Sequence, residues 1–269
     1  MLIVQNAKLV PNAAGSPPVI SYEYPINERT RTLLRLEDLC SRVDFFLNQG
    51  EAMAHHAALV TLFEILDVSG RADLKSDLMQ ELERQKQALS LLRDNPAVSE
   101  DALEDVLDEI EAASSGLFAM PGKIGQHLKD NEWLMNIKQR TGIPGGACEF
   151  DLPSYHYWLN QSAERRRHDL DLWLAPVQPI RNGISIVLRI LRESGRTLRY
   201  VAQNGCFQQI LAGRTAQMLA VSLDASLPYV PEISANKYAL NIRFVTAEIR
   251  QRPKPCESDI EFKLSFYNL

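Results

Sequence analysis

The chain has 269 residues, of which 45% are hydrophobic and 23% are charged, a composition typical of one large globular domain or two closely associated ones. With 29 Lys and Arg against 34 Asp and Glu, the formal net charge is −5, which argues against general binding to nucleic acid or other polyanions. No apolar run approaches the ~20 residues that cross a bilayer, and the first residues lack the basic start and sustained apolar run of a signal peptide. We therefore expect a cytoplasmic protein that binds neither membrane nor nucleic acid.

The chain is expected to begin with a flexible extension followed by one short strand. Residues 1–18 are rich in Pro, Ala, Gly and Ser, which predicts no regular element there. Residues 19–25 combine β-branched and aromatic side chains and are predicted to form a strand. Pro25 ends this strand, and Asn27 is a suitable N-cap for the helix that follows.

In residues 26–145 and again in residues 154–195, apolar side chains recur with the period of a helix. Leu36, Leu39 and Val43, for example, repeat at spacings of three and four residues, as on one face of a helix. Beyond Gly195 the hydrophobic period drops to two, which indicates strands. The clearest of these is the last, in which Ile260, Phe262, Leu264 and Phe266 alternate with polar residues. Earlier segments of the same kind are 199–202, 207–210, 218–223 and 238–245.

Together these patterns predict an α+β fold, in which a helical domain packs with a mainly antiparallel β-sheet domain. Residues 146–153 alternate weakly between polar and apolar, and we expect them to add a mid-chain strand to the sheet. The helical domain would comprise residues 26–145 plus 154–195. The β domain would comprise residues 19–25, 146–153 and 196–269, that is, the N-terminal strand, the mid-chain strand and the C-terminal region.

Charge is distributed unevenly between these parts. Residues 196–269 hold nine Lys and Arg against six Asp and Glu, a net of +3, whereas residues 1–195 hold 20 against 28, a net of −8, and the two sum to −5. A mildly basic sheet can therefore offer a local anion-binding surface despite the overall sign. The densest basic cluster, Arg165–His168, lies in helical sequence, where successive side chains turn by about 100° and diverge.

No motif in the sequence points to catalysis or to a metal site. The segment Gly116–Ile124 resembles a phosphate-binding loop, but its glycines are wrongly spaced and Ile124 stands where a magnesium-binding hydroxyl is needed. The five histidines form no i,i+4 pair with a supporting carboxylate, and the four cysteines form no CxxC pair. We predict no catalytic residue, no cofactor and no metal ion.

Three stretches of the sequence resemble the ZapD family of bacterial cell-division proteins, which associate with the Z-ring and bind FtsZ. The first is Tyr24–Glu37, the predicted strand-to-helix junction, and the second and most specific is Ile143–Pro153, with His156 and Trp158 after it. The third is Ile233–Phe244 in the C-terminal sheet. The three stretches occur in the order and at the spacing of that family, and the resemblance extends over residues 19–245.

The resemblance implies a cytoplasmic homodimer that captures the C-terminal tail of FtsZ on a basic surface. Two such surfaces per dimer would cross-link FtsZ protofilaments into bundles at the midcell division ring and so support septum formation. The resemblance implies no catalysed reaction and no cofactor. Two alternatives from other classes stay open at this point, namely a nucleic-acid-binding regulator and an unrecognised small-molecule enzyme.

Arginine is the residue type best suited to grip an acidic peptide, because its planar guanidinium matches a carboxylate. Arg31 and Arg35 are one turn apart on the first predicted helix, and both are candidates for tail binding. Arg35 can alternatively form a structural pair with Glu28 or Glu37. Arg71 follows the second predicted helix and either points to the same region or caps a helix.

The predicted sheet offers a second set of candidates. Lys237 and Arg243 are six residues apart, so in a regular strand both side chains emerge on the same face. His156 follows the predicted mid-chain strand and either binds the tail or is a buried structural histidine. The opposite, core-facing side of the Lys237–Arg243 strand would carry Tyr238, Leu240 and Ile242.

Overall fold

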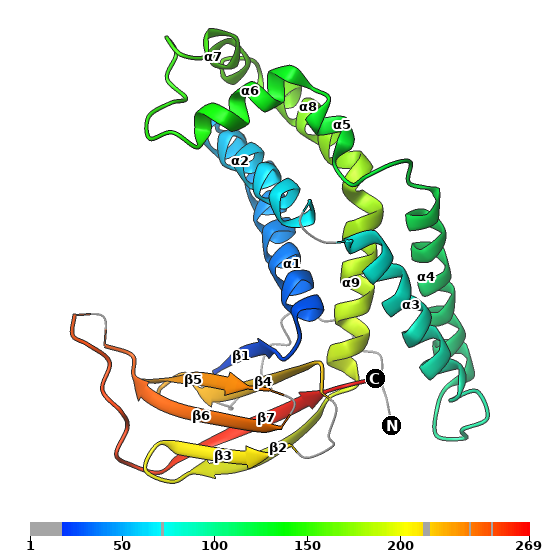
Figure 1. The fold of residues 1–269 in the computed structure, drawn as a ribbon, viewed down its shortest axis with the longest axis vertical. Coiled ribbons are helices and arrows are strands. Elements are labelled where there is room, and N and C mark those ends of the chain that lie inside the picture. The colour runs from blue at the N-terminus through cyan, green and yellow to red at the C-terminus, as the bar shows by residue number, and fades with distance from the viewer. Residues whose placement is uncertain (1–17, 71–72, 212–215, 237, 249) are drawn as a thin grey trace. The chain divides into compact units, whose positions relative to one another are not determined.

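The structure is a computed structural model that describes residues 18–70, 73–211, 216–236, 238–248 and 250–269 (Figure 1). The chain divides into two compact units. We call residues 1–31 with 189–269 the β unit and residues 32–188 the helical unit, and each is described by itself. Helices and antiparallel strands occupy separate stretches of the chain, which confirms the predicted α+β fold class.

Two antiparallel sheets form the β unit. The first has the strand order β1-β4-β7-β2 and the second the order β3-β6-β5. The N-terminal strand therefore joins C-terminal strands, as predicted, and Tyr22 of β1 pairs with Val221 of β4. The strands are β1 (Val19–Pro25), β2 (Arg196–Ala202), β3 (Cys206–Ile210), β4 (Met218–Asp224), β5 (Tyr229–Ala235), β6 (Ala239–Thr246) and β7 (Ile260–Tyr267).

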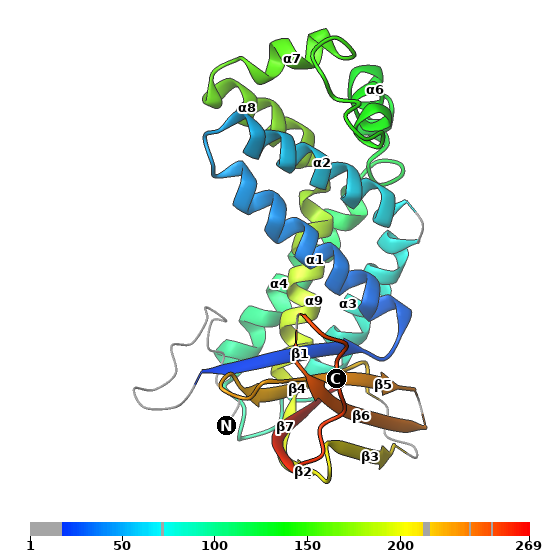
Figure 2. The same cartoon turned by 90° about the vertical axis from the view of Figure 1, so that its left-hand side faces the viewer.

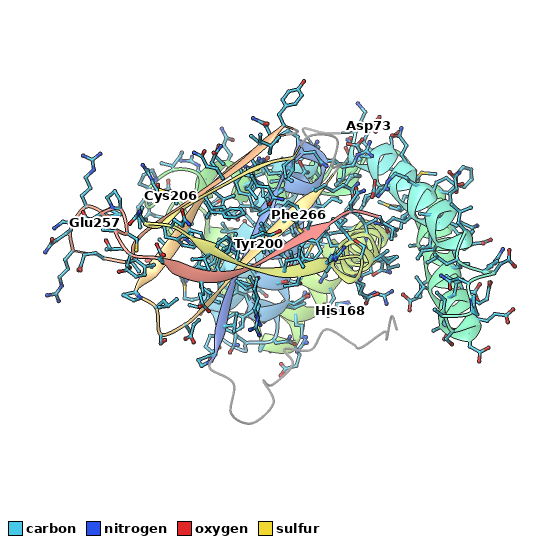
Figure 3. The ribbon with its side chains drawn as sticks, turned by 90° about the horizontal axis from the view of Figure 1, so that it is seen from below. Asp73, His168, Tyr200, Cys206, Glu257 and Phe266 are labelled. Atoms are coloured by element: carbon cyan, nitrogen blue, oxygen red, sulfur yellow. The ribbon has the colours of Figure 1, made fainter. Side chains whose placement is uncertain are left out.

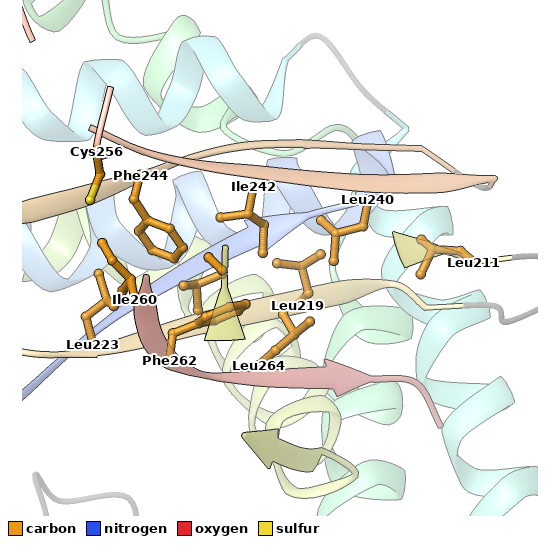
Figure 4. Close-up of a cluster of buried hydrophobic side chains, with 12 residues drawn as sticks. Leu211, Leu219, Leu223, Leu240, Ile242, Phe244, Cys256, Ile260, Phe262 and Leu264 are labelled. Carbon is orange, nitrogen blue, oxygen red and sulfur yellow. The ribbon is translucent and has the colours of Figure 1, made fainter. Parts of the chain in front are cut away.

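The core of the β unit lies between the facing sides of these two sheets (Figure 4). On β7, Ile260, Phe262 and Leu264 are at most 3% exposed, while Glu261 and Lys263 between them are exposed, as the alternation predicted. On β6 of the other sheet, Leu240, Ile242 and Phe244 are buried in the same cluster. Burying each such side chain stabilises the unit by about 1.5–3 kcal/mol, so the alternation fixes which face of each strand is left for partners.

The helical unit is built from amphipathic helices joined by short turns. Polar side chains cap three of their N-termini: Ser99, Asn131 and Ser162 each accept a hydrogen bond from a backbone N–H three residues on. Figure 1 shows α3 alongside α4, and Figure 2 shows α2 beside α8. The helices are α1 (Glu28–Leu47), α2 (Ala52–Ser69), α3 (Leu74–Ser90), α4 (Glu100–Ala119), α5 (Gln126–Lys129), α6 (Glu132–Thr141), α7 (Pro153–Leu159), α8 (Ala163–Leu174), the 3₁₀ turn η1 (Ala175–Val177) and α9 (Gln178–Glu193).

One cation of the basic cluster on α8 is buried inside the helical unit. Arg166 is 5% exposed, and its Nε donates to Nδ1 of the buried His55 at 3.1 Å. The same guanidinium donates to the carbonyl oxygens of Gly50 at 2.8 Å, of Leu159 at 3.0 Å and of Gln161. Burial first, and then the Arg166 cation, lower the pKa of His55. Arg166 is therefore a structural cross-link rather than a solvated surface residue.

The predicted mid-chain strand is wrong. Residues 146–151 form turns, and Pro153 opens α7. The backbone N–H of Leu152 donates to the Cys148 carbonyl at 2.9 Å, so the segment satisfies its polar groups locally instead of in a sheet ladder. Gly145 has φ of 72°, as a tight turn requires, but the turn leads into a helix of the helical unit.

Two details of the second sheet also differ from expectation. The strand β5 was not predicted, because Pro231 interrupts its alternation; Pro231 is tolerated since β5 lies at the sheet edge. Tyr238 was expected in the core but is 64% exposed, because β6 begins only at Ala239. The side chain of Asn236 accepts from the backbone N–H groups of Tyr238 and Ala239 and so shapes the turn before β6.

Candidate partner-binding site

Arg243 projects from the solvent-facing side of β6. Its neighbours Ile242 and Phe244 are buried, and its own side chain is 58% exposed, which confirms the predicted parity at this position. Lys237, predicted to share that face, lies outside the described residues. Of the two residues expected to form a basic strand face, Arg243 is therefore the one that lies in the described part of the sheet.

A carboxylate already faces Arg243. Glu232 on β5 is its directly opposed cross-strand partner, and the guanidinium contacts it through Nε at 3.0 Å and Nη2 at 2.5 Å. The hydrogen bond and charge of Glu232 raise the pKa of Arg243. On the other side, Arg243 pairs with Cys206 of β3. Glu232 thus fixes the position of the guanidinium, and an incoming carboxylate has to replace or share this contact.

Arg31 lies in the first turn of α1 and is largely engaged by its surroundings. Its Nε pairs with the Glu28 carboxylate at 3.0 Å, and its Nη2 lies 3.5 Å from the Pro25 carbonyl. The guanidinium also lies 5.9 Å from the centre of the Tyr24 ring, within range of a cation–π interaction. With 32% of its side chain exposed, Arg31 mainly fastens the junction between β1 and α1.

Arg35, one turn further along α1, is exposed, whereas Leu33 and Leu36 beside it are buried. Within the described part of the chain, no carboxylate pairs with Arg35, including the suggested Glu28 and Glu37. It is therefore available to an external anion. Arg71, the third helical candidate, lies outside the described residues.

His156 is exposed on α7, not buried. Its Nε2 lies 3.7 Å from the Glu149 carboxylate and 3.3 Å from Nδ2 of Asn160. The helix α7 lies at the opposite end of the helical unit from the part of α1 with which this unit begins, at residue 32 (Figures 1 and 2). Because Arg35 is twelve residues before the end of α1, about 18 Å along its axis, His156 and Arg35 do not meet within this unit.

Three cations that the sequence interpretation passed over lie in the segment between β6 and β7. Arg250, Arg252 and Lys254 are all exposed. The signal was present in the sequence, as basic residues at alternate positions separated only by Gln251 and Pro253, with no acid among them. This basic segment was not predicted, because it has neither the helical nor the strand period from which the other candidate residues were identified.

Two further findings bear on the kind of protein this is. No helix in the described ranges has the length and apolar character needed to cross a membrane. Among the same residues, no group of three or more His, Cys, Asp or Glu side chains is placed to hold a metal ion.

The profile of a family described as "ZapD: Cell division protein" matches residues 34–243. A protein named Cell division protein ZapD from Aromatoleum aromaticum is 58% identical over 252 residues, covering 94% of this chain and 98% of that protein. Proteins of the same name from Azoarcus sp. and Chromobacterium violaceum are 58% and 56% identical, covering 93% and 92% of this chain and 100% and 98% of their own length.

Proposed function

Because the chain belongs to the ZapD family of cell division proteins, we propose that it binds the C-terminal tail of FtsZ and cross-links FtsZ protofilaments as a homodimer. In this role it acts in the cytoplasm, at the midcell division ring, as an adaptor that supports septum formation. It catalyses no reaction and needs no cofactor.

The exposed guanidinium of Arg243 on the outer face of β6 is the observation that carries the tail-binding part of this proposal. A flexible tail loses conformational entropy on binding, so a small interface must supply strong directional contacts. Charge-assisted hydrogen bonds from arginine to carboxylate are of that kind. Arg35 supports the proposal as a second exposed guanidinium, while Arg31 and His156 are supporting candidates with neighbours of their own. Arg71 and Lys237 remain candidates from sequence.

Bundling requires that each assembly hold two tails at once. A homodimer provides this, because its two-fold symmetry duplicates every binding surface. Linking two weak sites in one particle also raises the overall avidity without any new contact, provided that both can be engaged together. Each site can therefore bind its tail weakly while the dimer, which holds two tails, bundles filaments strongly.

Sedimentation with polymerised FtsZ tests the proposal directly. Full-length FtsZ and FtsZ lacking its C-terminal tail are pelleted separately with the protein, and bundles are measured by light scattering. We expect co-pelleting and bundling only with the intact tail, and a two-chain mass in analytical ultracentrifugation. Equal co-pelleting with tail-less FtsZ would contradict the tail mechanism, and a single-chain mass would contradict cross-linking by a dimer.

A further inference from the structure

The strand β2 leaves one side of its backbone open at the edge of the first sheet. In the strand order β1-β4-β7-β2, it pairs with β7 alone, over seven consecutive residues in unbroken register. Figure 3 labels Tyr200 on β2 and Phe266 on the neighbouring β7. Along residues 196–201, all of which the structure describes, no backbone group makes a further hydrogen bond on the side away from β7. The N–H and C=O groups that point to that side are therefore open to another strand.

The other three edge strands differ from β2 in their residues. Pro231 interrupts β5, which also carries Glu232. The strand β1 ends in Pro25, and its Glu23 is bound by Arg192. The strand β3 has five residues and none of them is charged. Among the edge strands of the two described sheets, β2 is thus the one that carries cations and no acid.

Two cations oppose each other directly on the solvent-facing side of this edge. Arg199 of β2 is the cross-strand partner of Lys263 of β7, and both are exposed. Like charges directly opposite each other destabilise a sheet. In the described part of the chain, no carboxylate forms an ion pair with either cation, and this includes Glu261, which shares their face two residues before Lys263. The pair therefore lacks an anion that would offset its repulsion.

The side chains of β2 define what a strand added beside it has to carry. Arg199 and Val201 lie on the outer face, whereas Leu198 and Tyr200 lie on the face that continues the core. Leu198 is 40% exposed, although Leu264 directly opposite it is buried. An added strand therefore meets a cation on one face and an uncovered apolar side chain on the other. A sequence in which acidic and apolar residues alternate is complementary to both.

We propose that β2 is a docking edge for an extended partner segment of alternating acidic and apolar residues, which adds to the first sheet as a further strand. An acidic side chain opposite Arg199 offsets the repulsion between Arg199 and Lys263, and an apolar neighbour covers Leu198. The open backbone groups of β2 supply the remaining affinity through a hydrogen-bonded ladder. This inference goes beyond the proposed function and does not depend on FtsZ binding.

The charges of β2 disfavour the β2 strand of a second copy as the occupant. Arg196 and Arg199 are the charged residues of this strand, so no register of β2 against β2 brings an anion to Arg199. Cations on an edge strand oppose pairing between identical edges in this way. The same cations leave the edge selective for an acidic strand.

The test uses the full-length protein and a fluorescent synthetic peptide of alternating valine and glutamate, as long as β2. One comparison peptide has lysine in place of glutamate, and another is methylated on its backbone nitrogens and cannot donate ladder hydrogen bonds. Fluorescence anisotropy measures binding, and hydrogen–deuterium exchange locates the peptide, with β1 as the comparison edge. The variant Arg199→Glu, which puts an acid opposite Lys263, is compared with Arg42→Glu, at an exposed cation of the helical unit. Both variants change the formal charge from −5 to −7.

We expect the glutamate peptide to bind about tenfold more tightly than either comparison peptide and to slow exchange in residues 196–201 but not in β1. Arg199→Glu should keep the Tm of the wild type, bind the glutamate peptide about tenfold more weakly and bind the lysine peptide more tightly. Arg42→Glu should stay within about twofold of the wild type.

Four outcomes would overturn the docking edge. These are no binding of the glutamate peptide, equal binding by Arg199→Glu and the wild type, equal binding of the methylated peptide, and protection from exchange at another edge instead of β2. Ultracentrifugation provides a further check, because a dimer that Arg199→Glu dissociates would mean that a second copy occupies this edge, which would also contradict the proposal.

Discussion

Glu232 and Arg243 face each other directly across β5 and β6, with Nε of the arginine 3.0 Å from the carboxylate. The pair is exposed, at 50% and 58% of the respective side chains. An exposed ion pair of this kind contributes only about 0.2–1 kcal/mol. It is therefore strong enough to orient Arg243 and weak enough for a partner's carboxylate to replace it.

Substitution Glu232→Gln should strengthen tail binding, because it removes the negative charge that competes for Arg243. From the energy of an exposed pair we expect the dissociation constant for the FtsZ tail peptide to fall by about two- to fivefold. Isothermal titration calorimetry measures it. The matched control is Glu104→Gln, which removes an exposed carboxylate bound to Arg93 in the helical unit and should leave the affinity unchanged. Weaker binding of Glu232→Gln would mean that Glu232 helps the partner instead of competing with it.

Reversing the charge of Arg35 should abolish bundling without unfolding the protein. The side chain is exposed and contributes no described ion pair, so Arg35→Glu should shift Tm by less than about 2 °C, as surface substitutions do. We expect at least a tenfold loss in FtsZ co-pelleting. The control is Arg42→Glu on the same helix, also exposed, which should bundle normally. Normal bundling by Arg35→Glu would remove this residue from the site while leaving the family assignment intact.

Stability should fall with acidification in a way that depends on His55. Burial and the Arg166 cation lower the pKa of this histidine in the folded protein below its ordinary value of about 6.5. Below that pH the unfolded chain binds a proton that the folded state does not, so the unfolding free energy decreases as the pH falls. The contribution of one such group is at most about 1.4 kcal/mol per pH unit.

Chemical denaturation between pH 5 and 8 measures this slope. His55→Gln keeps an acceptor for Arg166 and should show a shallower decline below about pH 6.5 than the wild type. His168→Gln, which changes an exposed histidine on α8, should match the wild type. Identical slopes for all three proteins would show that His55 titrates alike in the folded and unfolded chain.

Gly205 packs closely against Cys256, and its carbonyl accepts from the Phe244 N–H at 2.8 Å, so Gly205→Ala should destabilise the β unit. Its φ is +69°, and a Cβ there would lie 2.6 Å from the Cys256 carbonyl oxygen. The strained backbone alone costs about 1–3 kcal/mol. Gly50→Ala is the control, since a Cβ at Gly50 meets nothing within 4 Å and should change stability by less than about 0.5 kcal/mol. Thermal unfolding compares the two, and equal Tm values would contradict this account.

The strands were predictable where one face of a strand is buried and the other is wet. On β7 the alternation of Ile260, Glu261 and Phe262 reflects this difference between the two faces. The edge strand β5 escaped prediction because an edge tolerates Pro231, which a central strand would exclude. Residues 146–153 were misassigned because weak alternation in a short segment does not distinguish a strand from consecutive turns.

In the candidate site, too, some features could be predicted from the sequence and others could not. Sequence spacing correctly placed Arg243 on the outer face, since Ile242 and Phe244 next to it must be buried. It could not show that Glu232 lies opposite, because cross-strand register depends on how the hairpin closes. Nor could it show that Arg166, within a run of exposed basic residues, is the one turned inward to His55.

By itself, the sequence determined the α+β class, the cell-division family, the outward position of Arg243 on β6 and the alternation of β7, because each follows from local periodicity or from residues in a fixed order. Only the tertiary structure decided which charges are already matched and which are left for a partner. Arg31, Arg166 and Arg243 are all arginines in the sequence, yet one fastens a strand to a helix, one is buried in a network and one faces solvent across from a carboxylate. The physical reason is that the availability of a charge depends on neighbours brought together from distant parts of the chain.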